Sequence, residues 1–128
     1  MTALELPAPD ASAEAWGRLA VSLPGWRWMP GMLDTEGNRW GEVTLQYLQE
    51  WRYSLPYPDD HAVAGCMLRL LESEDISLHS DGNGSPIYLD WWDPKTPMND
   101  PIRFEAPTIG RVCIMVAAHI GRWPGGKA

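Results

Sequence analysis

Two parts of this sequence follow the same order, a polar turn between two strand-like segments and then a long helix with an apolar stripe. The clearer turn is Asp81-Gly82-Asn83-Gly84, which lies between Ile76–Ser80 and Ile87–Trp91. Asp-Gly and Asn-Gly pairs tolerate positive φ and favour tight turns between antiparallel strands. The sequence therefore predicts a β-hairpin over residues 76–91.

The other hairpin is expected earlier in the chain. Trp26–Leu33 and Arg39–Val43 flank a polar turn that contains Gly37 and Asn38. Pro30 cannot donate to a ladder, so the first of these strands is predicted to be an edge strand or a bulged one. Thr44–Leu55 fits both a helical and a strand period, and we favour a strand at its end.

Three helices are expected around these hairpins. Apolar residues repeat at helical spacing over Ala11–Leu23, over His61–Glu74, and from near Pro107 to Gly121. Ile102–Phe104 adds a short strand before the last helix. The predicted fold class is α+β, a mostly antiparallel sheet from two β-hairpins with three helices packed on it.

The chain length favours one domain. At 128 residues the chain is close to the commonest domain size, so we expect a single domain over residues 11–124 and a flexible segment over residues 1–10. Cys66 and Cys113 both lie within apolar helical patterns, which indicates reduced core thiols. The sequence shows neither a signal peptide nor a run of about 20 apolar residues, so a cytoplasmic protein without membrane contact is expected.

The charge is distributed unevenly. The net charge is −7, and residues 72–105 contain eight acidic side chains against Lys95 and Arg103. A protein this acidic is not expected to bind nucleic acid directly through backbone phosphates. The acidic segment is either a solvated surface that aids solubility or a docking face for a partner with a basic surface.

The sequence offers no pattern that is typical of catalysis or metal binding. His61, His79 and His119 are widely separated, and neither cysteine has a second one at metal-ligand spacing. Ser77 and His79 would share one strand face with Asp81, a geometry that seldom converges on one reacting atom. We expect no catalytic residue, no metal and no cofactor.

Trp91 and Trp92 are the best candidates for an exposed apolar contact. Neighbouring strand residues face opposite sides, so both rings are buried only if the sheet is covered on both faces or the strand ends there. Otherwise one ring stands beside Asp90 and Asp93, and tryptophan is enriched at the centres of protein interfaces.

Three stretches resemble small uncharacterised phage and prophage proteins, including those grouped as the phage α-β-α (ABA) sandwich type. They are Trp26-Arg27-Trp28, Pro58–Cys66 and Ala106–Arg111, and the resemblance extends over about residues 14–122. It implies an origin in a mobile genetic element and no particular chemistry, because the family has no agreed catalytic residues to transfer.

The sequence thus predicts a non-enzymatic phage or prophage accessory protein that acts by protein–protein binding. One concrete form is an inhibitor of a host defence complex, such as an anti-CRISPR protein, which would occupy a basic groove that normally holds nucleic acid. The alternatives are a virion structural or assembly component and a small enzyme with an unrecognised site; the oligomeric state is left open. The predicted partner-binding residues are Glu74, Asp75, Asp81, Asp90, Trp91, Trp92, Asp93 and Asp100.

Overall fold

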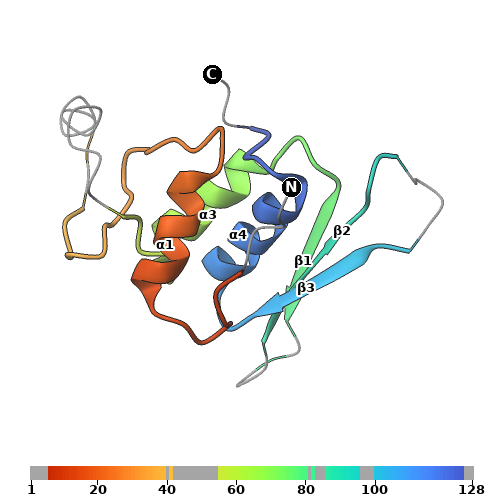
Figure 1. The fold of residues 1–128 in the computed structure, drawn as a ribbon, viewed down its shortest axis with the longest axis horizontal. Helices are drawn as coiled ribbons and strands as arrows, with labels where there is room; N and C mark the ends of the chain where they lie inside the picture. Colours follow the sequence, from red (N-terminus) through yellow and green to blue (C-terminus); the bar gives the residue numbers. More distant parts are fainter. Residues whose placement is uncertain are drawn as a thin grey trace.

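The structure is a computed structural model that describes residues 6–39, 41, 55–80, 82, 86–95 and 100–125. Within these residues the chain forms three α-helices and one three-stranded antiparallel sheet, which confirms the α+β class. The elements, labelled as in Figure 1, are α1 (Ala13–Ser22), α3 (His61–Leu70), β1 (Ile76–Ser80), β2 (Ile87–Trp91), β3 (Ile102–Ala106) and α4 (Ile109–Ile120).

The sheet has the strand order β1-β2-β3, so each strand pairs with its neighbour in sequence. Leu89 in the central strand lies opposite Leu78 of β1 and Phe104 of β3. The hairpin predicted over residues 76–91 is confirmed with the predicted strand bounds. β3 continues to Ala106, beyond the predicted end at Phe104.

The helices form layers on one side of the sheet. α4 packs against β2 and β3, while α1 and α3 pack against α4 on the side away from the sheet (Figure 1). Of the described helices, only α4 packs on the sheet, whereas the sequence predicted that all three would. The reason is that α4 is apolar enough to be covered from both sides.

The burial of α4 shows this directly. Every residue from Gly110 to Ala117 is buried, including Arg111. A helix with one apolar stripe would leave its opposite face in water, but a central helix is buried all round. Gly110 permits the close packing at the start of α4, because a Cβ there would lie only 1.8 Å from the carbonyl oxygen of Pro58.

Polar side chains begin each helix. The Ser12 hydroxyl accepts from the backbone N–H of Ala15, and the Asp60 carboxylate accepts from Ala62 and Val63. Thr108 caps α4, which is why the helix begins one residue after it and not at Pro107. α3 ends at Leu70, four residues before its predicted end at Glu74, because the chain turns at residues 71–73 to reach β1.

The hairpin predicted over residues 26–43 is not formed by the described residues. The polar turn is present, since the Asp34 carboxylate accepts from the N–H groups of Glu36 and Asn38, and Leu33 forms an isolated bridge with Arg39. Residues 26–32, however, contain no strand. Pro30 and Gly31, whose φ is 95°, end regular extension there. Residues 40 and 42–54 lie outside the described residues. Of the ambiguous segment Thr44–Leu55, only Leu55 is therefore described.

Tryptophans close the end of the core beside α1. The ring of Trp26 packs edge-to-face on Trp28 and lies 5.7 Å from the ring of Trp123. The buried Trp123 indole donates to the carbonyl of Ala20, and the Trp16 indole donates to Ala8. No helix in the described part of the chain has the length and hydrophobicity needed to cross a bilayer.

Candidate functional site

The sheet register gathers acidic residues at one end of the sheet. Ile76, Trp91 and Ile102 lie in one row across the three strands. The residues just beyond this row are Asp75 before β1, Trp92 and Asp93 after β2, and Asp100 before β3. We call these four residues the acidic end.

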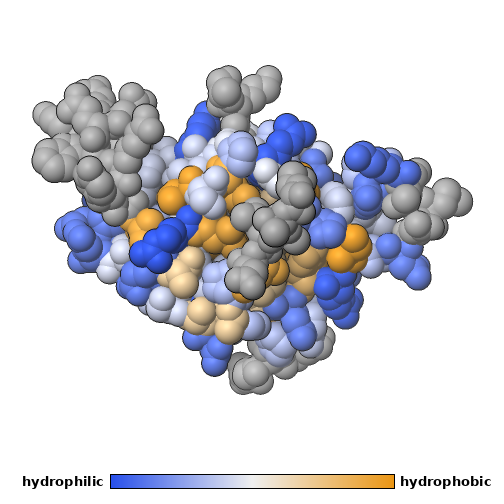
Figure 2. All heavy atoms as spheres, viewed as in Figure 1, coloured by the Kyte–Doolittle hydropathy of each residue, from blue (hydrophilic) through white to orange (hydrophobic). Residues whose placement is uncertain are grey.

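The acidic end presents charge to solvent. Asp75 and Asp100 are exposed, and Trp92 and Asp93 are half-buried. The backbone N–H of Trp92 donates to the carbonyl of Asp75 over 3.0 Å, so the strand ends are held together. The part of the molecule that carries the β2–β3 connection, at the right of Figure 2, is coloured mostly hydrophilic.

Trp91 is a core residue and not an exposed contact. It faces α4 with 6% of its surface exposed, and its ring packs edge-to-face on His119. Its indole N–H donates to the carboxylate of Glu74 over 2.8 Å. A buried indole N–H needs a hydrogen-bond acceptor, and the Glu74 carboxylate supplies it for Trp91.

Asp90 lies on the open face of the sheet, yet it is 7% exposed. Nε and Nη2 of Arg103, directly across on β3, donate to its two carboxylate oxygens over 2.8 and 3.1 Å. Nε2 of His79 lies 3.2 Å from the same carboxylate. Hydrogen bonding to Arg103 holds the pKa of Asp90 below its usual value, with a smaller lowering from His79.

An aromatic ring completes this group of side chains. Tyr88 stacks on His79 with ring centroids 5.7 Å apart, and the Arg103 guanidinium lies 5.0 Å from the Tyr88 centroid. The charge of Asp90 is thus paired within the protein, by side chains of the two neighbouring strands. Of the predicted contact residues, Asp90, Trp91 and Glu74 have intramolecular roles, and Asp81 lies outside the described residues.

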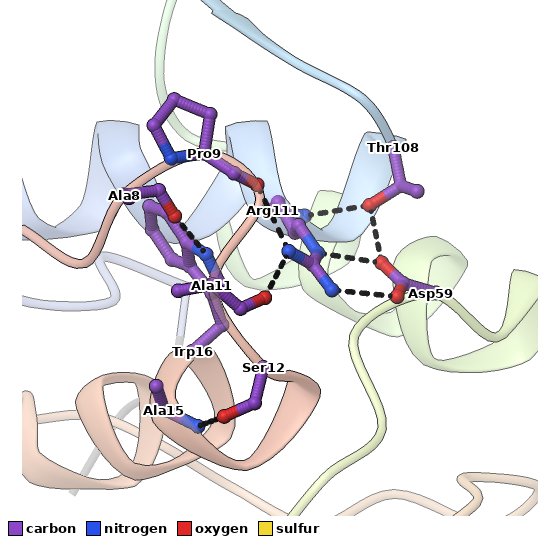
Figure 3. Close-up of polar contacts among 9 residues, drawn as sticks. All are labelled: Ala8, Pro9, Ala11, Ser12, Ala15, Trp16, Asp59, Thr108 and Arg111. Atoms are coloured by element: carbon purple, nitrogen blue, oxygen red, sulfur yellow. Dashed lines mark hydrogen bonds and ion pairs between the residues drawn. The ribbon is translucent and has the colours of Figure 1, made fainter.

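A second polar cluster was not predicted from the sequence. Figure 3 shows Arg111 of α4 between Asp59 on one side and the backbone of Pro9 and Ala11 on the other. Its Nε and Nη2 donate to Asp59 over 2.9 Å each, and Nη1 donates to the two carbonyls. The Thr108 hydroxyl donates to the same carboxylate over 2.7 Å.

This cluster, the Arg111 clamp, joins the segment before α1 to the starts of α3 and α4. Burial alone would raise the pKa of Asp59, but the hydrogen bonds from Arg111 and Thr108 outweigh it and keep the pKa below its usual value. Pro9 belongs to the segment predicted to be flexible, and the clamp holds its carbonyl. The available sequence signal was a single arginine inside an apolar helical pattern.

Cys66 is half-buried and Cys113 buried, and burial raises the pKa of both thiols. Among the described residues, no three His, Cys, Asp or Glu side chains are placed to hold a metal ion.

No family model matches this chain, and no curated protein or solved structure matches it either. The resemblance to phage ABA-sandwich proteins therefore stays a prediction.

Proposed function

We propose that this protein is a non-enzymatic binding protein and that its acidic end contacts a protein partner with a basic surface. The observation that carries the proposal is the convergence of three separate chain segments at this end. Asp75, Asp93 and Asp100 are up to 25 residues apart in sequence, yet each lies next to the terminal row of the sheet.

The placement of Trp92 adds an apolar component to this surface. It is half-buried beside Asp93, and its backbone bonds to Asp75. An aromatic residue next to carboxylates suits an interface, because its ring supplies contact area and the carboxylates select a partner of opposite charge. Trp92 and not Trp91 is thus the tryptophan that we assign to the contact.

The concrete form of the proposal is a cytoplasmic phage or prophage protein that inhibits a host defence complex, as an anti-CRISPR protein does. The carboxylates would occupy a basic groove that otherwise holds nucleic acid. Supporting this form are the net charge of −7 and the position of the acidic end at the terminal row of the sheet.

The test compares two triple variants that each remove three negative charges. D75N/D93N/D100N neutralises the acidic end, and D10N/E14Q/E36Q neutralises exposed residues elsewhere. Each tagged protein is used for affinity capture from host lysate with quantitative mass spectrometry at low and moderate salt. We expect one set of proteins that the native chain and the control capture and the first variant loses, most clearly at low salt.

Equal capture by both variants would contradict the proposal. Equal loss in both would also contradict it, because total charge and not the acidic end would then carry the binding.

An assembly component of a virion is the second candidate, and the sheet edges favour it. In the described part of the chain, β1 and β3 each pair on one side only, so each has an edge that can accept another strand. Light scattering over a range of concentrations tests this candidate. A mass that rises with concentration supports it, and a constant monomer mass opposes it.

A further inference from the structure

In the described part of the chain the sheet has two free edges, and they differ in how they are protected. Exposed strand edges usually carry charged side chains or prolines, which prevent pairing with another strand. β3 contains Arg103 and Glu105, and it lies between Pro101 and Pro107. β1, with the sequence Ile-Ser-Leu-His-Ser, contains no proline and no Asp, Glu, Lys or Arg. The edge of β1 is therefore the one that is open to pairing.

The backbone groups that β1 offers at this edge follow from the sheet register. The backbone N–H of Trp92 donates to the carbonyl of Asp75, so Asp75 turns its carbonyl toward β2. Along an antiparallel strand, successive residues turn their N–H and carbonyl groups to opposite sides. The groups that point away from β2, to the free edge, are those of Ile76, Leu78 and Ser80.

The same edge has an uncovered apolar side chain. Leu78 lies opposite the fully buried Leu89 of β2, so both side chains are on the helix side of the sheet. α4 packs against β2, but no described helix packs against β1. Leu78 is accordingly 37% exposed, and Ile76 on the same face is half-buried. A strand added here would bury apolar surface in addition to bonding the backbone.

We propose that the edge of β1 pairs with β1 of a second copy of this chain, in antiparallel orientation, and that the two sheets become one sheet of six strands. The pairing is centred on Ser77, which lies opposite Ser77 of the second copy. In this register Ile76 of each copy lies opposite Leu78 of the other, and Asp75 of each lies opposite His79 of the other.

The occupant is a second copy because β1 is complementary to itself in this register. A two-fold axis perpendicular to the sheet brings the same patch of both copies together, and opposite residues share a face. Ile76 and Leu78 then form two apolar cross-strand pairs, which stabilise a sheet. A register centred on Leu78 would place Ile76 opposite Ser80, and one centred on His79 would place two imidazoles opposite each other.

Charge also favours this register. Nε2 of His79 contacts Asp90 within its own copy, so Nδ1 is the nitrogen that faces Asp75 of the second copy. The two Asp75 residues are four residues apart along the paired strands, about 13 Å, which exceeds the Debye length of about 8 Å at physiological ionic strength. The two acidic ends lie at opposite ends of the paired strands, so the net charge of each copy opposes the pairing only weakly.

Matched cysteine substitutions test the register. Ser77→Cys places two thiols across the two-fold axis, in a pair without backbone hydrogen bonds whose Cα atoms are about 4.5 Å apart, a distance that a disulfide spans. Ser80→Cys makes the same change on the same strand, but its two thiols would be six residues apart along the pair, about 20 Å. After mild oxidation, non-reducing gel electrophoresis should show a linked dimer as the main species of Ser77→Cys. Ser80→Cys and the native chain, whose Cys66 is half-buried and Cys113 buried, should remain unlinked.

A pair of lysine substitutions tests which edge associates. Leu78→Lys and Ile102→Lys each replace an apolar residue of an edge strand, 37% and 40% exposed respectively, by a residue that protects edges. Sedimentation velocity over a range of concentrations should show a dimer of the native chain and of Ile102→Lys. Leu78→Lys should self-associate about tenfold more weakly, because two apolar cross-strand pairs are lost. Thermal unfolding of both variants checks that each remains folded.

The pairing goes beyond the proposed contact at the acidic end and does not depend on it. A native chain that is monomeric at every concentration would overturn the pairing, and so would equal cross-linking of Ser77→Cys and Ser80→Cys. Loss of the dimer in Ile102→Lys and not in Leu78→Lys would assign the association to β3 and overturn it as well. The contact at the acidic end is judged separately, by the capture of host proteins with D75N/D93N/D100N and its control.

Discussion

Arg111 is buried within α4, and each nitrogen of its guanidinium group donates a hydrogen bond. A buried cation destabilises a fold unless its charge is paired and its donors are used. Asp59 meets both requirements in a two-bond pair, and the carbonyls of Pro9 and Ala11 take the remaining nitrogen. These bonds compensate the unfavourable burial of the cation, and they link three chain segments.

Arg111→Met is therefore expected to destabilise the protein strongly. The apolar side chain fits the burial but leaves the Asp59 carboxylate and the two carbonyls without this donor. We expect a loss of about 3–5 kcal/mol in the free energy of unfolding, measured by urea denaturation with tryptophan fluorescence.

The matched control for that substitution is Arg39→Met. Arg39 forms the other Asp–Arg pair at the start of α3, but its side chain is 53% exposed. Exposed ion pairs contribute little, so the unfolding midpoint should change only slightly. If the two variants were equally stable, the clamp would have no special structural role.

At the scale of elements, local chemistry determined what the sequence could predict. The bounds of β1 and β2 followed from the turn sequence Asp81-Gly82-Asn83-Gly84 between them. The strand predicted over Trp26–Leu33 is not formed, because Pro30 and Gly31 interrupt the extended chain, and Trp26 instead packs on Trp28 and Trp123. That packing depends on the far end of the chain and has no local signal.

The candidate site was partly predictable for the same reason. The acidic segment was visible in the sequence, but the strand register decides which of its residues face a partner. It turns Trp91 toward α4 and places Asp90 opposite Arg103, while Asp75 and Asp100 stay exposed. Asp59 and Arg111 are 52 residues apart, a separation at which no spacing rule predicts a pair.

Two glycines in neighbouring helices test how closely α4 packs. Gly110→Ala places a Cβ 1.8 Å from the backbone oxygen of Pro58, so the start of α4 must move, and we expect a loss of about 1–3 kcal/mol. Gly65→Ala meets open space in α3 and should gain up to about 1 kcal/mol. Thermal unfolding of both proteins measures the two changes, and a stabilising Gly110→Ala would contradict the packing described here.

At the scale of the whole molecule, three paired carboxylates link distant parts of the fold. Asp59 pairs with Arg111, which joins the starts of α3 and α4 to the segment before α1, and Asp60 joins α3 to the loop that contains Arg39. Asp90 joins the outer strands of the sheet through His79 and Arg103. All three have a pKa below the usual value for aspartate.

These shifts predict that the protein loses stability in acid. The unfolded chain binds protons near pH 3.9, the ordinary aspartate pKa, while the folded carboxylates stay ionised to lower pH. The unfolded state then holds more protons, so the contribution of these groups is complete above about pH 5 and is lost as the pH falls through the folded pKa values. Urea midpoints between about pH 7 and pH 3 should fall steeply below about pH 4. Asp59→Asn should lower the urea midpoint at pH 7. It should also reduce the decrease of the midpoint in acid, because one of the three carboxyl groups no longer titrates. An unchanged decrease in this variant would show that Asp59 does not contribute to the acid sensitivity.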